Sequence, residues 1–435
     1  MTDAVLRHGR ASLGLSFGVQ GVAFALLVTR IPAIQDRYGI SDGLLPVFLA
    51  AVPILAGAGS VATEKVVARV RPSVVLRWAQ PLVLLALLGV GAGREMWHVA
   101  VALGVFGLAV GALDASMNML GVSLQRAYGR SIMTGFHAAY SLGGIAGASL
   151  AWAGARWEMS LLASYLPVVA VLLPAALVGS RWYTEGKGAE GAGPDGTKAA
   201  TKAATKAATK AATKAATETG TETGTESGAG FVGAGGAFSF KLLLPLCLIM
   251  TFAYIGDSTV SNWSAKYLQD VLGSSEQLAT VPYNVYMVTT LLGRAVGDLG
   301  VRRFGAVAVV RGGSLLAAGG FAVVAVAPGA WVGMLGFTML GFGLCVIVPQ
   351  TFAAAGRMFP GNSDAAVARL NIFNYVGFLV GSPLVGALGD AWSYRGAMLV
   401  PMVLVLATLV YARAFGPEPA RYGGGHERPR TADVG

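Results

Sequence analysis

Long runs of apolar residues alternate with short polar segments along most of the chain. A helix needs about 20 residues to cross roughly 30 Å of hydrocarbon. Twelve runs meet that length, at residues 11–31, 44–63, 74–93, 97–120, 131–153, 159–180, 239–261, 278–299, 305–327, 330–351, 366–389 and 394–415. The pattern predicts an all-α membrane protein with twelve transmembrane helices and both termini on one side.

A polar, low-complexity segment divides these runs into two sets of six. It contains five Thr-Lys-Ala-Ala units between Thr197 and Ala216. Its lysines recur every four residues, which is compatible with a solvated spacer or with a helix adsorbed on an anionic membrane surface. We expect an N-terminal six-helix bundle at 1–181, a cytoplasmic linker at 182–238, a C-terminal six-helix bundle at 239–415, and a disordered cytoplasmic tail at 416–435.

Lysine and arginine are concentrated in alternate loops. The basic loops include Lys65, Arg69, Arg71 and Arg77; Arg126 and Arg130; and Arg302, Arg303 and Arg311. Because basic loops tend to remain in the cytoplasm, we expect both termini and the linker there, in a protein of the cytoplasmic membrane. This topology also explains most of the net charge of +10, which in a soluble chain would suggest a nucleic-acid partner.

Composition narrows the classes of function. Hydrophobic residues make up 54% of the chain and charged residues only 12%, which excludes an ordinary soluble protein. Cys247 and Cys345 lie in apolar runs, and their spacing fits neither a metal site nor a disulfide framework. The sequence has no phosphate-binding loop and no HExxH motif. We expect no enzyme activity, no cofactor, no metal and no nucleic-acid partner.

Three polar residues interrupt the apolar runs of the N-terminal half. Asp114 and Asn118 follow Gly107 and Gly111 on one helix face, at i, i+4, i+7 and i+11. His137 lies in the next run. An ionisable group costs at least ~2.5–3.5 kcal/mol at the bilayer centre, so we expect polar residues in these runs to have a structural or functional role. Each is either a structural hydrogen-bonding group or part of a functional site.

A weak internal repeat favours a functional role for Asp114. Glycines recur at the same spacing in the fourth and tenth runs, at Gly104 and Gly111 and at Gly336 and Gly343. In this register Val346 stands at the position of Asp114. The scaffold repeats, whereas the charge does not.

Further polar groups lie in other runs. Asp257 is a second candidate carboxylate, unless it lies near the membrane surface and is hydrated. Side chains that could bind a neutral polyol-like ligand are Gln20, Asn118, Tyr254, Asn262, Asn284, Asn371 and Asn374. Each of them alone could instead form a hydrogen bond between helices.

Two sets of six spans, together with one loop signature, resemble the major facilitator superfamily. The signature, which this family has between its second and third spans, recurs in the second half as Gly293, Arg294, Gly297, Asp298, Arg302 and Arg303. Its first-half copy, from Gly59 to Arg71, is degenerate, with Glu64 in place of the usual Asp. The resemblance implies two bundles around a central cavity, with the signature acting as a gating loop.

Within that superfamily, the stretch from Asp114 to Asn118 is similar to the fourth span of fucose permease-like sugar/proton symporters. The stretch from Phe136 to Gly143 is similar to their fifth span, with His137 where they have an amide. The resemblance implies a monomer that moves a small molecule by alternating access. It also implies proton coupling, for which Asp114, Asp257 and His137 are the candidates.

Two other functions remain compatible with the sequence. The same carboxylates would serve an exporter of drugs or secondary metabolites that works by proton antiport. A membrane sensor or scaffold that transports nothing is the third possibility, with the linker as its interaction surface.

Overall fold

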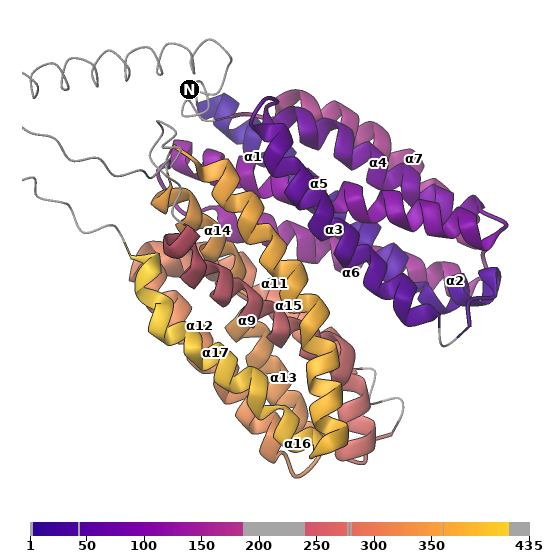
Figure 1. Ribbon diagram of the computed structural model, residues 1–435, viewed down its shortest axis with the longest axis vertical. Helices are drawn as coiled ribbons and strands as arrows, with labels where there is room; N and C mark the ends of the chain where they lie inside the picture. Colours follow the sequence, from indigo (N-terminus) through magenta and orange to yellow (C-terminus); the bar gives the residue numbers. More distant parts are fainter. Residues whose placement is uncertain are drawn as a thin grey trace, which may run out of the picture.

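The computed structural model describes residues 3–41, 44–185, 240–275, 278, 281–359 and 361–416. Nearly all of these residues are helical, and the helices form two bundles (Figure 1). The prediction of an all-α membrane protein with two six-helix bundles is therefore confirmed. The predicted linker and tail fall almost wholly outside the described residues.

The N-terminal bundle contains the helices from α1 to α7. They are α1 (Asp3–Thr29), α2 (Ile31–Tyr38), α3 (Leu45–Val67), α4 (Pro72–Ala92), α5 (Met96–Tyr128), α6 (Met133–Arg156) and α7 (Leu161–Gly179), followed by the short η1 (Ser180–Trp182). The short α2 was not expected, since it lies beyond the first apolar run. Part of the basic loop expected at Arg126 and Arg130 is helical, as far as Tyr128, so α5 is longer than its apolar run.

The C-terminal bundle contains the helices from α9 onwards. They are α9 (Phe240–Lys266), η3 (Tyr267–Val271), α11 (Val281–Phe304), α12 (Ala306–Val326), α13 (Ala330–Leu344), α14 (Ile347–Met358), α15 (Ser363–Ala391), α16 (Tyr394–Ala397), α17 (Leu399–Tyr411) and η4 (Ala412–Phe415). The tenth predicted span is split between α13 and α14. Pro349 explains the break, because in a continuous helix its ring would clash with the carbonyl group of Cys345 four residues earlier.

Ten helical segments in the described residues are long and apolar enough to cross a membrane. Two further helices, α6 and α11, have 24 residues each but are more polar. These two helices pack against each other at the junction of the bundles, as α3 and α15 also do. Their polarity therefore belongs to the interface between the bundles, and with them the described residues provide the twelve spans of the prediction.

Glycines allow several of the helices to approach closely. A Cβ atom at Gly111 would overlap the carbonyl oxygen of Ala56, and one at Gly107 would lie 2.9 Å from that of Val52, so both glycines face α3. Gly21 and Gly143 similarly bring α1 against α6. Small residues are typical of such contacts, because helices in lipid associate through close packing.

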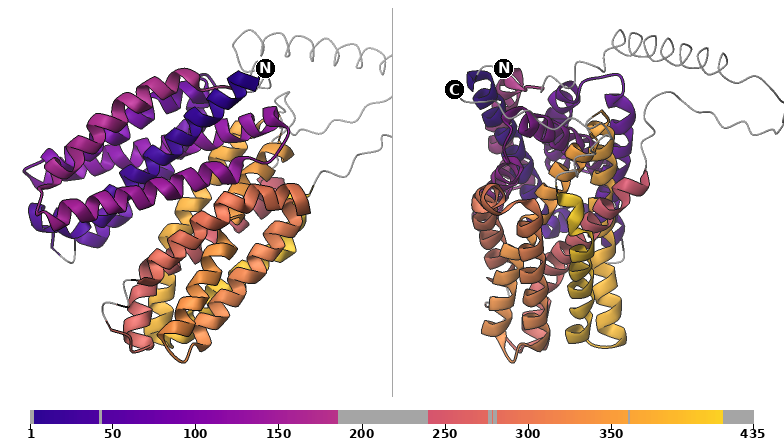
Figure 2. Two further views of the ribbon diagram at one scale, coloured as in Figure 1. Left: turned by 180° about the vertical axis from the view of Figure 1, so that it is seen from behind. Right: turned by 90° about the vertical axis from the view of Figure 1, so that its left-hand side faces the viewer.

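The two bundles meet at one end and diverge toward the other. They are close at the end where α1 begins, whereas α2 and α16 lie at the separated ends of the two bundles (Figures 1 and 2). At the first end, hydrogen bonds such as Arg126 to Ser363 and Arg302 to the carbonyl group of Ser131 join the two bundles.

Candidate functional site

Asp114 lies between the bundles and binds residues from both. Its Oδ1 accepts a hydrogen bond from Gln20 of α1 at 3.4 Å, and its Oδ2 accepts from Asn374 at 3.3 Å and from Tyr375 at 3.1 Å, both on α15. The carboxyl group is only partly buried. Asp114 thus links helices α1 and α5 of one bundle to helix α15 of the other.

Asp257 lies on α9 and has a different environment. Its Oδ1 accepts a 2.5 Å hydrogen bond from the hydroxyl group of Tyr286 on α11, which belongs to the same bundle. The side chain is partly buried, in the middle of the helix. Helix α9 ends at Lys266, nine residues after Asp257, which is about 13 Å along the helix axis. Asp257 therefore does not lie at the end of the helix.

Several tyrosines and one arginine surround the two carboxylates. Tyr140 of α6 and Tyr254 of α9 lie within electrostatic range of both Asp114 and Asp257, and of Arg294 on α11. Sequence reasoning did not single out Tyr140, because one tyrosine in a glycine-rich apolar run gives no distinct signal. The site therefore combines carboxyl, hydroxyl, amide and guanidinium groups.

His137 is buried beside this cluster. Its ring lies 5.3 Å from that of Phe17 and 6.2 Å from that of Phe352, measured between centroids. The Nε2 atom has no hydrogen-bond partner among the described residues. The carbonyl oxygen of His137 accepts a 3.4 Å hydrogen bond from Arg294. The histidine thus lies at the contact between α6 and α11, enclosed by aromatic rings.

The predicted ligand-binding amides do not all lie together. Asn374 contacts both Asp114 and Asn371, and Asn371 donates a further 3.4 Å hydrogen bond to Ser60 of α3. Asn118 donates to the carbonyl group of Asp114 on its own helix. Asn262 is exposed and donates to the carbonyl group of Ser258, also on its own helix.

Asn284 is likewise exposed, near the separated end of α11. We therefore retain Gln20, Tyr254, Asn371 and Asn374 as candidate ligand-binding residues. Asn262 and Asn284 are less favourably placed for that role. Asn118 is buried and donates to both the carbonyl group and Oδ1 of Asp114, so it stays a candidate.

The expected gating loop is helical. Gly293, Arg294, Gly297, Asp298, Arg302 and Arg303 all lie within the last turns of α11, which ends at Phe304. The span predicted at 278–299 already contains the first four of these residues, whereas Arg302 and Arg303 were expected in the loop that follows and lie in the helix. The gating role of the segment stays a prediction. No proline follows Pro282 in α11, so the helix continues to Gly305, whose φ of 82° allows the chain to turn.

Asp298 caps a helix of the opposite bundle. Its carboxylate accepts hydrogen bonds from the backbone N–H groups of Thr134 at 3.2 Å and Gly135 at 2.8 Å, and from the hydroxyl group of Ser131 at 2.6 Å. These N–H groups belong to the first turn of α6, where backbone donors lack partners within the helix. A negative charge is also favoured there by the helix dipole.

Glu64 occupies the corresponding place in the first half. Aligning Gly59 with Gly293 places Glu64 opposite Asp298 and Ser60 opposite Arg294. Glu64 forms an ion pair with Arg369 of α15, with an N–O distance of 2.7 Å. The degenerate copy of the signature therefore also binds the other bundle, through an arginine side chain and not through helix N–H groups.

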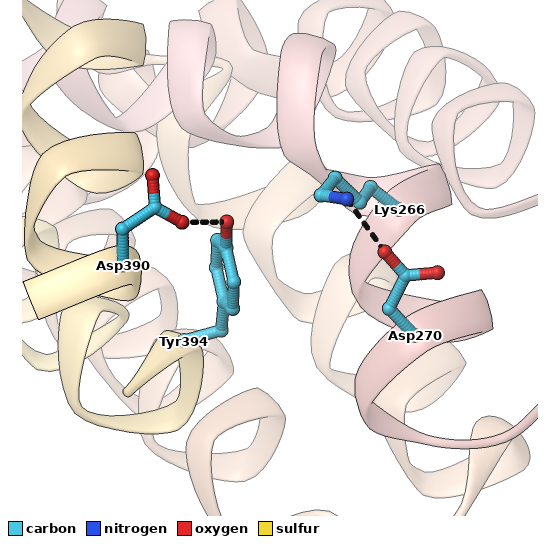
Figure 3. Close-up of polar contacts among 4 residues, drawn as sticks. All are labelled: Lys266, Asp270, Asp390 and Tyr394. Carbon is cyan, nitrogen blue, oxygen red and sulfur yellow. Dashed lines mark hydrogen bonds and ion pairs between the residues drawn. The ribbon is translucent and has the colours of Figure 1, made fainter. Parts of the chain in front are cut away.

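A further set of polar contacts lies at the separated end of the C-terminal bundle. Lys266 pairs with Asp270 at 2.6 Å, and Tyr394 donates a 2.6 Å hydrogen bond to Asp390 (Figure 3). All four side chains lie at the ends of their helices. We do not include this exposed group in the candidate site.

Comparison with known proteins finds similarity to membrane transporters. A sequence model described as Major Facilitator Superfamily matches residues 246–432. An uncharacterised MFS-type transporter of Yersinia pestis is 28% identical over 409 residues, which cover 93% of this chain and 95% of that protein.

Solved structures have the same fold. The structure of the transporter FucP in an outward conformation gives a TM-score of 0.70 at 16% identity, covering 94% of this chain and 98% of that one. A structure of the Escherichia coli fucose:proton symporter FucP gives a TM-score of 0.65 at 16% identity, with the same coverage.

Proposed function

Since the chain belongs to the major facilitator superfamily of membrane transporters, we propose that it is a proton-coupled symporter of a polar, sugar-like solute. The observation that carries the proposal is the position of Asp114, which accepts hydrogen bonds from α1 of its own bundle and from α15 of the other. A group that takes up a proton there changes the bonding between the bundles.

Alternating access requires such a connection. The donors of Asn374 and Tyr375 bind the carboxylate oxygen of Asp114 while the bundles are in the described arrangement. Protonation of Asp114, or hydroxyl groups of a solute that compete for these donors, would weaken the contact between α5 and α15. Proton and solute would then bias the same movement of the bundles, which is what coupling requires.

The described arrangement fits one state of an alternating-access cycle. The bundles are joined at the end that carries Asp298 and Arg302, which the distribution of basic residues assigns to the cytoplasm. The separated ends would then face outward. The likeness to FucP in an outward conformation supports this assignment.

The proposal is tested with purified protein in liposomes. An inward proton gradient should drive accumulation of a sugar or polyol against its concentration gradient. The Asp114→Asn variant, which resembles the permanently protonated form, should exchange solute between two filled compartments but should not accumulate it. Accumulation by a well-folded Asp114→Asn protein would contradict the proposal, and proton-driven extrusion of hydrophobic drugs would favour export by antiport.

A variant that lacks residues 188–236 separates transport from a scaffold role. A transporter should keep its flux without this segment, because the candidate residues of the site all lie within the two bundles. Loss of flux in a deletion variant with unchanged folding would indicate that the segment takes part in the activity.

A further inference from the structure

Arg294 is a positive charge within the span predicted at 278–299, and it has no direct ionic partner in the described residues. It is bonded to Ser141, which follows the start of α6 by eight residues, so the guanidinium lies about 12 Å from that helix end. Ion pairs within 4.0 Å in the described part of the chain join other residues. A charge at this depth is costly unless a counterion or a water-filled space accompanies it.

The bonds that Arg294 does make leave part of its guanidinium free. Nη1 donates to the hydroxyl group of Ser141 at 2.6 Å and to the carbonyl oxygen of His137 at 3.4 Å. Both acceptors are uncharged. The buried Nε has no partner among the described residues. A guanidinium carries five N–H donors, and it binds a carboxylate best with two of them in parallel.

Three candidate carboxylates of the two bundles have other partners. Asp298 is bound by the first turn of α6 and by Ser131, and Asp114 is bound by side chains of α1, α5 and α15. Asp257 is bound by Tyr286, which precedes Arg294 by eight residues, about 12 Å along α11. Asp257 and Arg294 interact through space without forming an ion pair.

We propose that Arg294 binds an anionic group of the transported solute, and that this solute is a polyhydroxy carboxylate such as a sugar acid. The proposal rests on the transport function proposed above and specifies its substrate class. Arg294 supplies the positive charge, while Tyr140, Tyr254 and Asn374 supply hydroxyl and amide groups suited to the hydroxyls of the ligand. The carboxylate of the solute takes the place of the missing counterion.

Matched pairs of compounds test the substrate class. We would measure the unfolding temperature of the purified protein with gluconate and glucose, and with glucuronate and galactose, keeping ionic strength constant with sodium chloride. The wild type should be stabilised by the acids more than by the sugars. Arg294→Gln should lose that difference, corresponding to at least a tenfold loss of apparent affinity for the acid, while Arg294→Lys should retain part of it. Arg311→Gln, which removes an exposed arginine of α12 outside the candidate site, is the matched control and should keep the difference.

Three results would overturn the proposal. One is an equal response of the wild type to acids and sugars, including no response to either. Another is an acid response that survives in Arg294→Gln. The third is strong coupling between Asp257→Asn and Arg294→Gln in a double-mutant cycle without ligand, because Asp257 would then be the counterion.

The outcome is distinguishable from that of the transport proposal. Proton-driven accumulation of a neutral sugar that is unaffected by Arg294→Gln would reject the anionic substrate and leave symport intact. Failure of the Asp114→Asn experiment would instead reject the coupling scheme, and it would leave the acid binding of Arg294 as measured.

Discussion

The carboxylate of Asp298 accepts a 2.8 Å hydrogen bond from the backbone N–H of Gly135, so a residue of one bundle caps a helix of the other. The residue before α6 is Ile132, whose side chain cannot cap a helix. Gln125 binds the N–H groups of Ile132 and Met133, and Asp298 binds the next two. The first turn of α6 therefore depends on the contact between the bundles.

Replacing Asp298 by Ala should loosen the closed end of the molecule. An N-cap is worth about 0.5–2 kcal/mol, which corresponds to a shift of roughly 2- to 30-fold between two states. A cysteine at Val122 would report the change, because Val122 is 2% exposed and packs against Gly356 of α14. In a background without Cys247 and Cys345, labelling of Val122→Cys should be faster when Asp298 is Ala.

Asp390→Asn is the matched control for this measurement. It removes an exposed carboxylate at the separated end, and it should leave the labelling of Val122→Cys unchanged. Equal labelling rates with and without Asp298 would show that the cap does not hold the bundles together.

The Glu64–Arg369 pair should contribute less than Asp298. The Glu64 side chain is 21% exposed and that of Arg369 is 35% exposed. Ion pairs near the surface are worth about 0–1 kcal/mol, because solvent screens them. Glu64→Gln should therefore increase labelling of Val122→Cys by a smaller factor than Asp298→Ala. The charge exchange Glu64→Arg with Arg369→Glu should restore the original rate. If Glu64→Gln increases the labelling more than Asp298→Ala does, the predicted ranking is wrong.

Much of the fold could be predicted from hydrophobic periodicity, because each span needs a long apolar run. The polar faces were harder to place. Asp114 was identified because a carboxylate in a glycine-rich run is unusual. The contact of the Arg294 side chain with the other bundle could not be predicted. Its motif is found near a loop and gives no indication that the helix continues to Phe304. Asn262 and Asn284 were selected by residue type alone, and in the structure both are exposed.

The pairing of side chains across the bundles also could not be predicted from one sequence. Tyr375 and Asp114 are separated by 261 residues. Their contact depends on how two bundles meet, which periodicity within a helix does not determine. The internal repeat gave partial guidance, because it aligned Glu64 with Asp298, but it did not reveal that their partners differ.

Two glycines of α5 should differ in their tolerance of alanine. A Cβ at Gly111 would overlap the carbonyl oxygen of Ala56, and backbone cannot move aside as a flexible side chain can. Gly111→Ala should lower stability by about 1–3 kcal/mol through overpacking. At Gly104 the nearest atom to a new Cβ is Leu55 Cδ1 at 3.9 Å, so Gly104→Ala should be nearly neutral. Unfolding temperatures in detergent compare the two, and equal values would contradict the packing argument.

The orientation in the membrane is tested with labels in residues 188–236. The distribution of Lys and Arg predicts that this segment is cytoplasmic. Single cysteines introduced there should react with an impermeant reagent in inside-out vesicles but not in intact cells. Reaction in intact cells would show that the orientation is opposite to the predicted one. The described arrangement would then be open toward the cytoplasm.

Asp257 should act differently from Asp114, because its hydrogen-bond partner lies in its own bundle. Tyr286 and Asp257 both belong to the C-terminal bundle, so removing their bond leaves the contact between α5 and α15 in place. Asp257→Asn should therefore act on KM, while the accumulation reached at saturating solute stays close to that of the wild type. Asp114→Asn should have the opposite pattern, with binding kept and accumulation lost. Tyr286→Phe, which removes only the donor to Asp257, should resemble Asp257→Asn in direction.

Initial rates and final accumulation, measured in the same liposomes, separate the two patterns. If Asp257→Asn abolishes accumulation while Asp114→Asn preserves it, the coupling proton belongs to Asp257.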